Sequence, residues 1–149
     1  MCRKIMNKEV ARPATIEDLK KLIKAFNESK VDYLLIGGYA LFAHGYQRAT
    51  TDIDFIFPAN KEFGLLVKDA LMSLPDKAAM DIDPLWFEDG ENIRVADEFV
   101  VDLMFNACGE TYGRSYAAFC LRNFLREILN ARVKIAGKHL RVLVPRHFH

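Results

Sequence analysis

Residues 52–57, Asp-Ile-Asp-Phe-Ile-Phe, constrain the fold most, because acidic and apolar side chains alternate at their start. This period is typical of a β-strand, in which successive side chains leave opposite faces of the sheet. Asp52 and Asp54 therefore share one face, while Ile53 and Phe55 suit a hydrophobic core. Two carboxylates on Cα atoms about 7 Å apart repel each other unless positive charge lies between them. A divalent cation would supply that charge, and Mg²⁺ prefers oxygen ligands of this kind.

A Gly-Gly pair precedes this strand. Val31–Ile36 is a short apolar run that predicts a buried strand, and Gly37-Gly38 ends it in a tight turn. Residues 39–44 then suit a short helix. Glycines at such a turn let backbone amides approach a phosphate, which the start of a helix also favours. Residues 39–51 are long enough for this helix and a return to the sheet, so we expect the glycines and Asp52 at the same edge.

Polar residues occupy the connection that leads into Asp52. Arg48 could neutralise a polyphosphate, or it could be a solvated loop charge. Thr50 and Thr51 could donate hydrogen bonds to a phosphate, or they could hold the loop through bonds to the local backbone.

A third acid, Asp102, lies within the apolar run Phe99–Phe105. An acid inside such a strand is unfavourable to bury without a partner, so it is a candidate to join Asp52 and Asp54. The alternative is that all three acids are solvent-facing strand residues or loop anchors. Another Asp-x-Asp, at residues 81–83, is followed at once by a proline, which favours a loop or a strand edge.

The other periodic segments define the fold class. Helical patterns run from Ile16 to near residues 27–30, with Thr15 as a cap, and over residues 61–73, with Asn60 as a cap. Further segments are a strand at Ile93–Val95, a helix over residues 116–128 and a hairpin over residues 132–144. This order predicts an α+β fold, a mixed β-sheet with helices packed mainly on one side.

Length and composition favour one ordinary packed domain. The chain has 149 residues, of which 51% are hydrophobic and 28% charged. We expect a polar leader over residues 1–14 and a single domain over residues 15–149. The net charge is only +1, so no overall basic character points to nucleic acid.

The cellular location follows from what the sequence lacks. The chain has three scattered cysteines, which fit a reducing cytosol. The first residues have no apolar stretch typical of a signal peptide, and no window approaches the roughly 20 apolar residues needed to cross a bilayer. We therefore expect a cytoplasmic protein with no membrane partner.

The combination of motifs resembles a known family. Gly37-Gly38-x-Ala40, followed by His44-Gly45-x-x-Arg48-x-Thr50-x-Asp52-Ile53-Asp54, is similar to the signature of the nucleotidyltransferase superfamily, which has a DNA polymerase beta-like fold. Its small prokaryotic MNT-type and AbiEii-like branches are the most similar. The family pattern ends with a third acid on a later strand, a place that Asp102 matches. The resemblance covers roughly residues 31–105.

The resemblance implies an activity and a set of site residues. Asp52 and Asp54 would bind two Mg²⁺ ions, or Mn²⁺, and Asp102 would complete the site and help to activate an attacking hydroxyl. The nucleotide, for example ATP, would be bound by Gly37, Gly38, Arg48, Thr50 and Thr51. The reaction would transfer a nucleoside monophosphate from an NTP to a hydroxyl of a protein, RNA or small molecule.

The resemblance also implies an alternative. Members of these branches belong to toxin–antitoxin and abortive-infection systems, so the chain could be an antitoxin-like or partner-binding module with little or no catalysis. Relatives usually continue past the closing hairpin into a helical segment, whereas this chain stops at residues 145–149. Either this chain is a short form, or a protein partner covers that surface.

Overall fold

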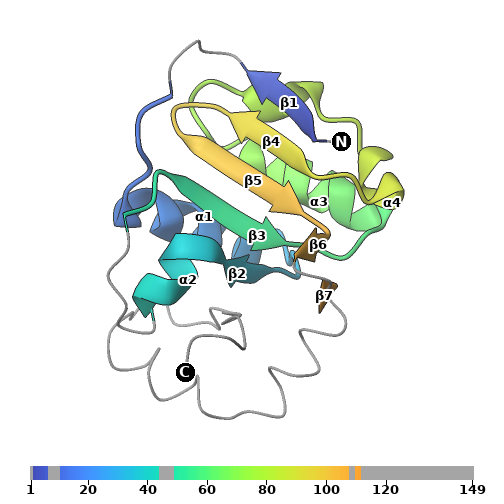
Figure 1. The fold of residues 1–149 in the computed structure, drawn as a ribbon. Helices are drawn as coiled ribbons and strands as arrows, with labels where there is room; N and C mark the ends of the chain where they lie inside the picture. Colours follow the sequence, from blue (N-terminus) through green and yellow to red (C-terminus); the bar gives the residue numbers. More distant parts are fainter. Residues whose placement is uncertain (1, 7–10, 44–48, 108–109, 112–149) are drawn as a thin grey trace.

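A computed structural model describes residues 2–6, 11–43, 49–107 and 110–111, which form a mixed α+β fold around a five-stranded sheet (Figure 1). The elements in chain order are β1 (Arg3–Met6), α1 (Ile16–Glu28), β2 (Leu34–Ile36), α2 (Gly37–Ala43), β3 (Asp52–Ile56), α3 (Lys61–Leu71), the 3₁₀ helix η1 (Ala78–Asp81), α4 (Trp86–Asp89), β4 (Ile93–Ala96), β5 (Val100–Met104), β6 (Asn106–Ala107) and β7 (Glu110–Thr111).

The main sheet has the strand order β1-β4-β5-β3-β2. Strand β3 runs parallel to β5 and antiparallel to β2, and β5 is antiparallel to β4. The register places Asp54 beside Asp102 on one side and beside Ile36 on the other. Arg94 of β4 lies beside Asp102. One row across the sheet therefore holds a guanidinium and two carboxylates.

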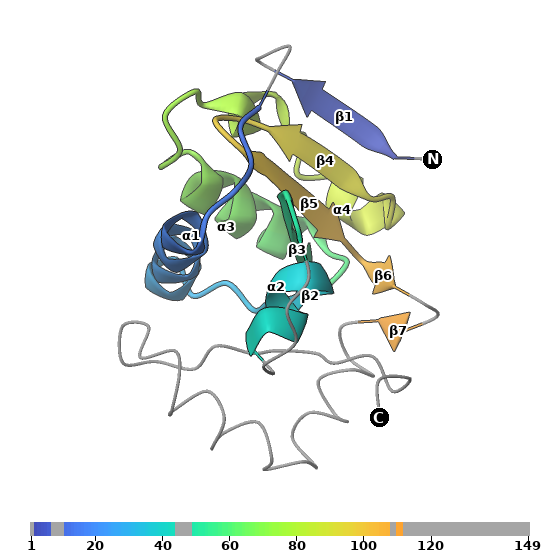
Figure 2. The same ribbon diagram turned by 60° about the vertical axis from the view of Figure 1, so that its left-hand side comes forward.

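The core lies between the sheet and two helices. Figure 2 shows α1 and α3 side by side against the same face of the sheet. That face carries Ile53, Phe55 and Val101, which have no exposed surface. The ring of Phe26, on α1, meets the ring of Phe55 edge to face, with 5.0 Å between centroids. On the opposite face, Asp52 and Asp54 of β3 and Asp102 of β5 are partly exposed, whereas Ile56 is buried in a small cluster with Leu34 and Ile36.

Two helices begin where the sequence predicts. The Thr15 hydroxyl accepts from the Asp18 amide in a capping box before α1, and the Asn60 side chain accepts from the Phe63 amide before α3. Helix α2 starts at Gly37, earlier than expected. The helix predicted at residues 116–128 and the hairpin at 132–144 lie outside the described residues. Of the helices that the structure describes, none has the length and apolar character to cross a membrane.

The first residues differ from the polar leader that the sequence favours. Arg3–Met6 forms β1, an edge strand parallel to β4, with Ile5 buried beside Val95. The strand was missed because it has only four residues and carries charges before Ile5. The Asp-x-Asp at residues 81–83, expected in a loop or at a strand edge, covers the last residue of η1 and the loop that follows it, where the Asp83 carboxylate accepts from the Leu85 amide at 2.9 Å.

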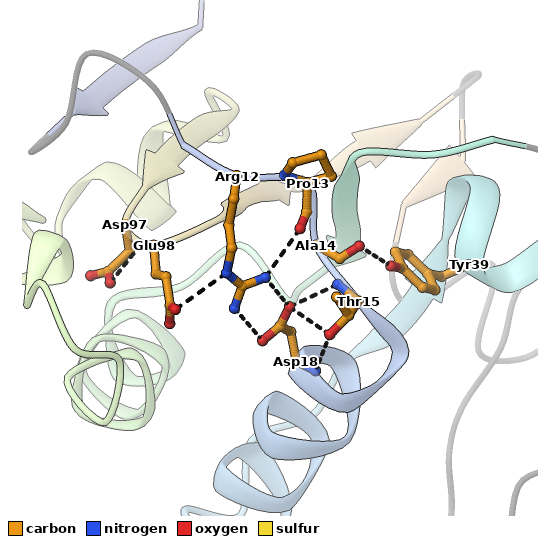
Figure 3. A network of polar contacts seen from close by, with 8 residues as sticks. All are labelled: Arg12, Pro13, Ala14, Thr15, Asp18, Tyr39, Asp97 and Glu98. Atoms are coloured by element: carbon orange, nitrogen blue, oxygen red, sulfur yellow. Dashed lines mark hydrogen bonds and ion pairs between the residues drawn. The ribbon is translucent and has the colours of Figure 1, made fainter.

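A polar network ties the segment after β1 to the domain (Figure 3). The Arg12 guanidinium donates to both carboxylate oxygens of Asp18, at 2.7 and 2.8 Å, and to Glu98 at 3.2 Å. Asp18 is 3% exposed and also accepts from the Thr15 amide and hydroxyl. These bonds satisfy the buried carboxylate, which would otherwise destabilise the fold.

The same segment reaches the strand that carries Asp52. The Ala14 amide donates to the Thr51 carbonyl at 2.9 Å, just before β3. The Tyr39 hydroxyl, on α2, donates to the Ala14 carbonyl at 2.7 Å (Figure 3). The start of β3 is therefore tied, through Ala14, to the N-terminal segment and to α2.

The Asp18 carboxylate makes the stability of the fold depend on pH. Its hydrogen bonds from Arg12, followed by those from Thr15, lower the pKa of Asp18 to about 2. A free aspartate has a pKa of about 3.9, so this stabilisation is complete above that pH and is lost as pH falls toward 2. We expect Asp18→Asn to reduce the free energy of unfolding by about 2 kcal/mol at neutral pH, and by less in acid. Urea unfolding at both pH values measures this.

Glu98→Gln is the matched control for Asp18→Asn. Glu98 pairs with the same guanidinium, but its side chain is 39% exposed. We expect a loss below about 1 kcal/mol, as for other exposed ion pairs. Equal losses of unfolding free energy in the two variants would contradict the conclusion that the buried Asp18 carboxylate contributes most of the stability of this network.

Candidate functional site

The structure brings Asp52, Asp54 and Asp102 together on the face of the sheet opposite α1 and α3. Asp54 and Asp102 are neighbours in the parallel register, and Asp52 is two residues earlier on the same side of β3. The side chains of Asp52 and Asp102 are 25% and 17% exposed, so both are accessible from solvent. The carboxylates thus stand on two hydrogen-bonded strands rather than on loops, which gives them well-defined positions.

Arg94 is the residue of this site that sequence reasoning missed. One guanidinium nitrogen donates to the two carboxylate oxygens of Asp102, at 3.0 and 3.3 Å, and another donates to Asp52 at 2.7 Å. Its position between Ile93 and Val95 marks it as the polar residue of a short strand. That signal cannot show which strand lies beside it, so the contact with the acids was not predictable.

The carboxylates interact strongly with one another. Burial raises the pKa of Asp54 to about 7, with further contributions from the charge and hydrogen bond of Asp102 and from the charge of Asp52, while Arg94 opposes the shift. Burial also raises the pKa of Asp102, and the charge of Arg94 counteracts it. Near neutral pH, Asp54 therefore carries a proton part of the time.

Gly37 lies directly against Asp54. Its φ angle is +71°, in the left-handed region that favours glycine, and a Cβ atom there would overlap the Asp54 carboxylate. A Cβ atom on Gly38 would stand 2.5 Å from Thr50 Cβ. The turn between β2 and α2 therefore contacts Asp54 and also Thr50, which precedes β3. The glycines and the start of β3 lie at the same edge of the sheet, as the sequence predicts.

The two threonines bond to Asp52. The Thr50 hydroxyl donates to the Asp52 carbonyl at 3.0 Å, and the Thr51 hydroxyl donates to the Asp52 carboxylate at 3.0 Å. Of the two roles left open by the sequence, these contacts match local support of the loop. Arg48 lies outside the residues that the structure describes.

The carboxylate oxygens of Asp52, Asp54 and Asp102 are the type of ligand atom that Mg²⁺ binds. Across the described part of the chain, however, no three or more His, Cys, Asp or Glu side chains are arranged as a group that could hold a metal ion. Asp52 and Asp102 both point to the Arg94 guanidinium, which supplies their positive charge. Metal binding at these residues would require that guanidinium to move.

Comparison with known proteins does not assign this chain to a family. No family model, curated protein or solved structure matches the chain. The resemblance to nucleotidyltransferases therefore rests on the motif residues of the sequence.

The close approach of Gly37 to Asp54 can be measured with a matched pair of glycines. Gly90 has nearly the same φ angle, +70°, but an added Cβ atom there would meet nothing within 4 Å. We expect Gly90→Ala to lose about 1 kcal/mol of stability through backbone strain alone. Gly37→Ala should lose more, because it also displaces the Asp54 carboxylate. Equal losses by chemical denaturation would contradict the contact.

The raised pKa of Asp54 predicts that the site destabilises the fold at alkaline pH. The folded state binds more protons than the unfolded state between about pH 4 and pH 7, so stability falls as pH rises through that range. Without divalent cations, we expect Asp54→Asn to melt at least about 3 °C above the unsubstituted protein near pH 8, and at a similar temperature near pH 4.

The control for this charge effect is Asp69→Asn, which removes an exposed carboxylate from α3. We expect it to leave the melting temperature nearly unchanged near pH 8. An Asp54→Asn variant that is no more stable than the unsubstituted protein near pH 8 would show that the ionised Asp54 carboxylate does not destabilise the fold.

Proposed function

We propose that this chain is a Mg²⁺-dependent nucleotidyltransferase, which transfers a nucleoside monophosphate from an NTP to a hydroxyl of a protein, RNA or small molecule. The observation that carries the proposal is the row formed by Asp54 and Asp102, with Asp52 two residues away and Gly37 against Asp54. These are the acids and the glycine turn of the family pattern, and they meet at one place.

Electrostatics support a functional role for these acids. Three neighbouring carboxylates repel one another, and the pKa of Asp54 is raised to about 7 as a result of burial and of that repulsion. A purely structural sheet gains nothing from such an arrangement. Strongly perturbed acids of this kind cluster at catalytic and binding sites.

Each residue has a role in the proposed reaction. Asp52, Asp54 and Asp102 would hold the Mg²⁺ ions, which when bound bind the triphosphate and stabilise charge on the attacking and leaving oxygens. The acceptor hydroxyl oxygen forms a bond to the α-phosphorus, and the bond to the bridging oxygen breaks to release pyrophosphate. Asp102 would help to take up the hydroxyl proton, the role that the resemblance implies for it.

The turn and the loop would contact the nucleotide. The absence of side chains at Gly37 and Gly38 lets the Asp54 carboxylate and the Thr50 side chain pack against the backbone of this turn. The backbone of the turn would bind a phosphate of the nucleotide, as the resemblance implies. The hydroxyls of Thr50 and Thr51 would position Asp52, to which both already donate. Arg48 would neutralise the triphosphate, as the resemblance implies.

The two Asp-x-Asp motifs of this chain provide a test with an internal control. The purified protein is incubated with Mg²⁺ or Mn²⁺, each of the four α-labelled NTPs, and candidate protein and RNA acceptors. We expect label transfer that falls at least about 100-fold in Asp52→Asn/Asp54→Asn, because the metal ligands are lost. Asp81→Asn/Asp83→Asn should retain activity, since a side-chain amide oxygen at position 83 can still accept from the Leu85 amide.

Absence of both Mg²⁺-dependent NTP binding and transfer would contradict the proposal. So would equal activity in the two double variants, because only one of the two motifs lies beside Asp102.

One observation favours the second candidate, an antitoxin-like or partner-binding module. Arg94 already pairs with Asp52 and Asp102, so part of the negative charge of these two acids is balanced without a metal ion. Under this alternative, Asp52→Asn/Asp54→Asn would show no transfer, like the parent chain, and would still neutralise its protein partner.

A further inference from the structure

Arg94 spans three strands to reach the two acids. It rises from β4 next to Asp102 on β5 and extends to Asp52 on β3, with nitrogen–oxygen distances of 3.0 and 2.7 Å. Both contacts are charge-assisted hydrogen bonds, which are stronger than neutral ones. The guanidinium thus stands between the two carboxylates that the proposed function assigns to metal binding.

The side chain can leave this position without disturbing the core. Its neighbours Ile93 and Val95 are fully buried and fix β4 from the other face. The Arg94 side chain itself is 37% exposed and lies on the face of the sheet opposite α1 and α3. Rotation about its side-chain bonds would move the guanidinium into solvent while the strand pairing stays intact.

We propose that Arg94 is an internal counter-cation, and that a divalent cation binds Asp52 and Asp102 by displacing its guanidinium. The inference rests on the proposed function, because it assumes that these acids hold the metal. The guanidinium already contacts both oxygens of Asp102 and one oxygen of Asp52, so a metal ion on these oxygens would lie close to a like charge, and we expect the two cations to exclude each other. The site is therefore either closed by Arg94 or filled by the metal, and Arg94 sets the metal concentration at which the two states exchange.

The direct test is metal affinity without nucleotide. Mn²⁺ binding to the full chain is measured by the loss of the free-ion electron paramagnetic resonance signal, for the unsubstituted protein and for Arg94→Met. We expect Arg94→Met to bind Mn²⁺ at least ten-fold more tightly, because the competing charge is gone. We also expect Mn²⁺ to raise the melting temperature of this variant more than that of the unsubstituted protein.

Arg3→Met is the matched control. Arg3, on the edge strand β1, also bridges two carboxylates, those of Asp89 and Glu91, at 2.9 and 3.4 Å. This variant loses the same charge by the same substitution, so its Mn²⁺ affinity should remain within two-fold of the unsubstituted protein. An equal gain in both variants would indicate a general effect of net charge and would overturn the inference.

Two further variants extend the test, and the first of them, Arg94→Lys, keeps it decisive if Arg94→Met folds poorly. Arg94→Lys retains a charge but lacks the planar fork that reaches two carboxylates, so its Mn²⁺ affinity should lie between those of the other two proteins. Arg94→Met/Asp52→Asn should lose the added affinity, which would place the metal at Asp52. If the lysine variant binds no more tightly than the unsubstituted protein, and Arg94→Met does not either, the inference is wrong.

The outcomes separate this inference from the proposed function. Mn²⁺ binding that is unchanged in Arg94→Met would overturn the inference and leave the nucleotidyltransferase proposal intact. Binding by Arg94→Met alone would support the inference and show that the unsubstituted chain is closed to metal, which contradicts Mg²⁺-dependent catalysis. No binding by any of the variants would contradict both.

Discussion

The parallel register of β3 with β5 places Asp54 beside Asp102, and the repulsion between their carboxylates governs the rest of the site. Burial and repulsion raise the pKa of Asp54 to about 7, so Asp54 is partly protonated near neutral pH. Arg94 offsets the remaining charge through its contacts with Asp52 and Asp102. Gly37 leaves room for the Asp54 carboxylate because it has no side chain. Burial, charge and close packing of the backbone therefore act together on the same three acids.

The opposite face explains why this arrangement is tolerated. Ile53, Phe55 and Val101 alternate with the acids and are buried completely against α1 and α3. Burial of large apolar side chains contributes about 1.5–3 kcal/mol each, which stabilises the strands that hold the carboxylates together. The Arg12 network adds a second support, because it ties the N-terminal segment to α1 and to the residue before β3.

Local patterns were sufficient for much of the secondary structure. The cap residues Thr15 and Asn60 and the apolar periodicity after them marked the starts of α1 and α3. Strand β1 was missed because Ile5 alone among its described side chains is buried, and four residues give too little periodicity. Its place in the sheet depends on pairing with β4, which lies far along the sequence.

The sequence by itself determined that Asp52 and Asp54 share a face, because side chains on a strand repeat every two residues. It also placed glycine at the turn where a left-handed conformation is needed. Only the tertiary structure decided which strands lie side by side, and therefore that Asp102 and Arg94 join these acids. The raised pKa of Asp54 is also a result of the tertiary structure, since it arises from burial and from charges on neighbouring residues. Strand order results from packing of the whole chain, and no local pattern encodes it.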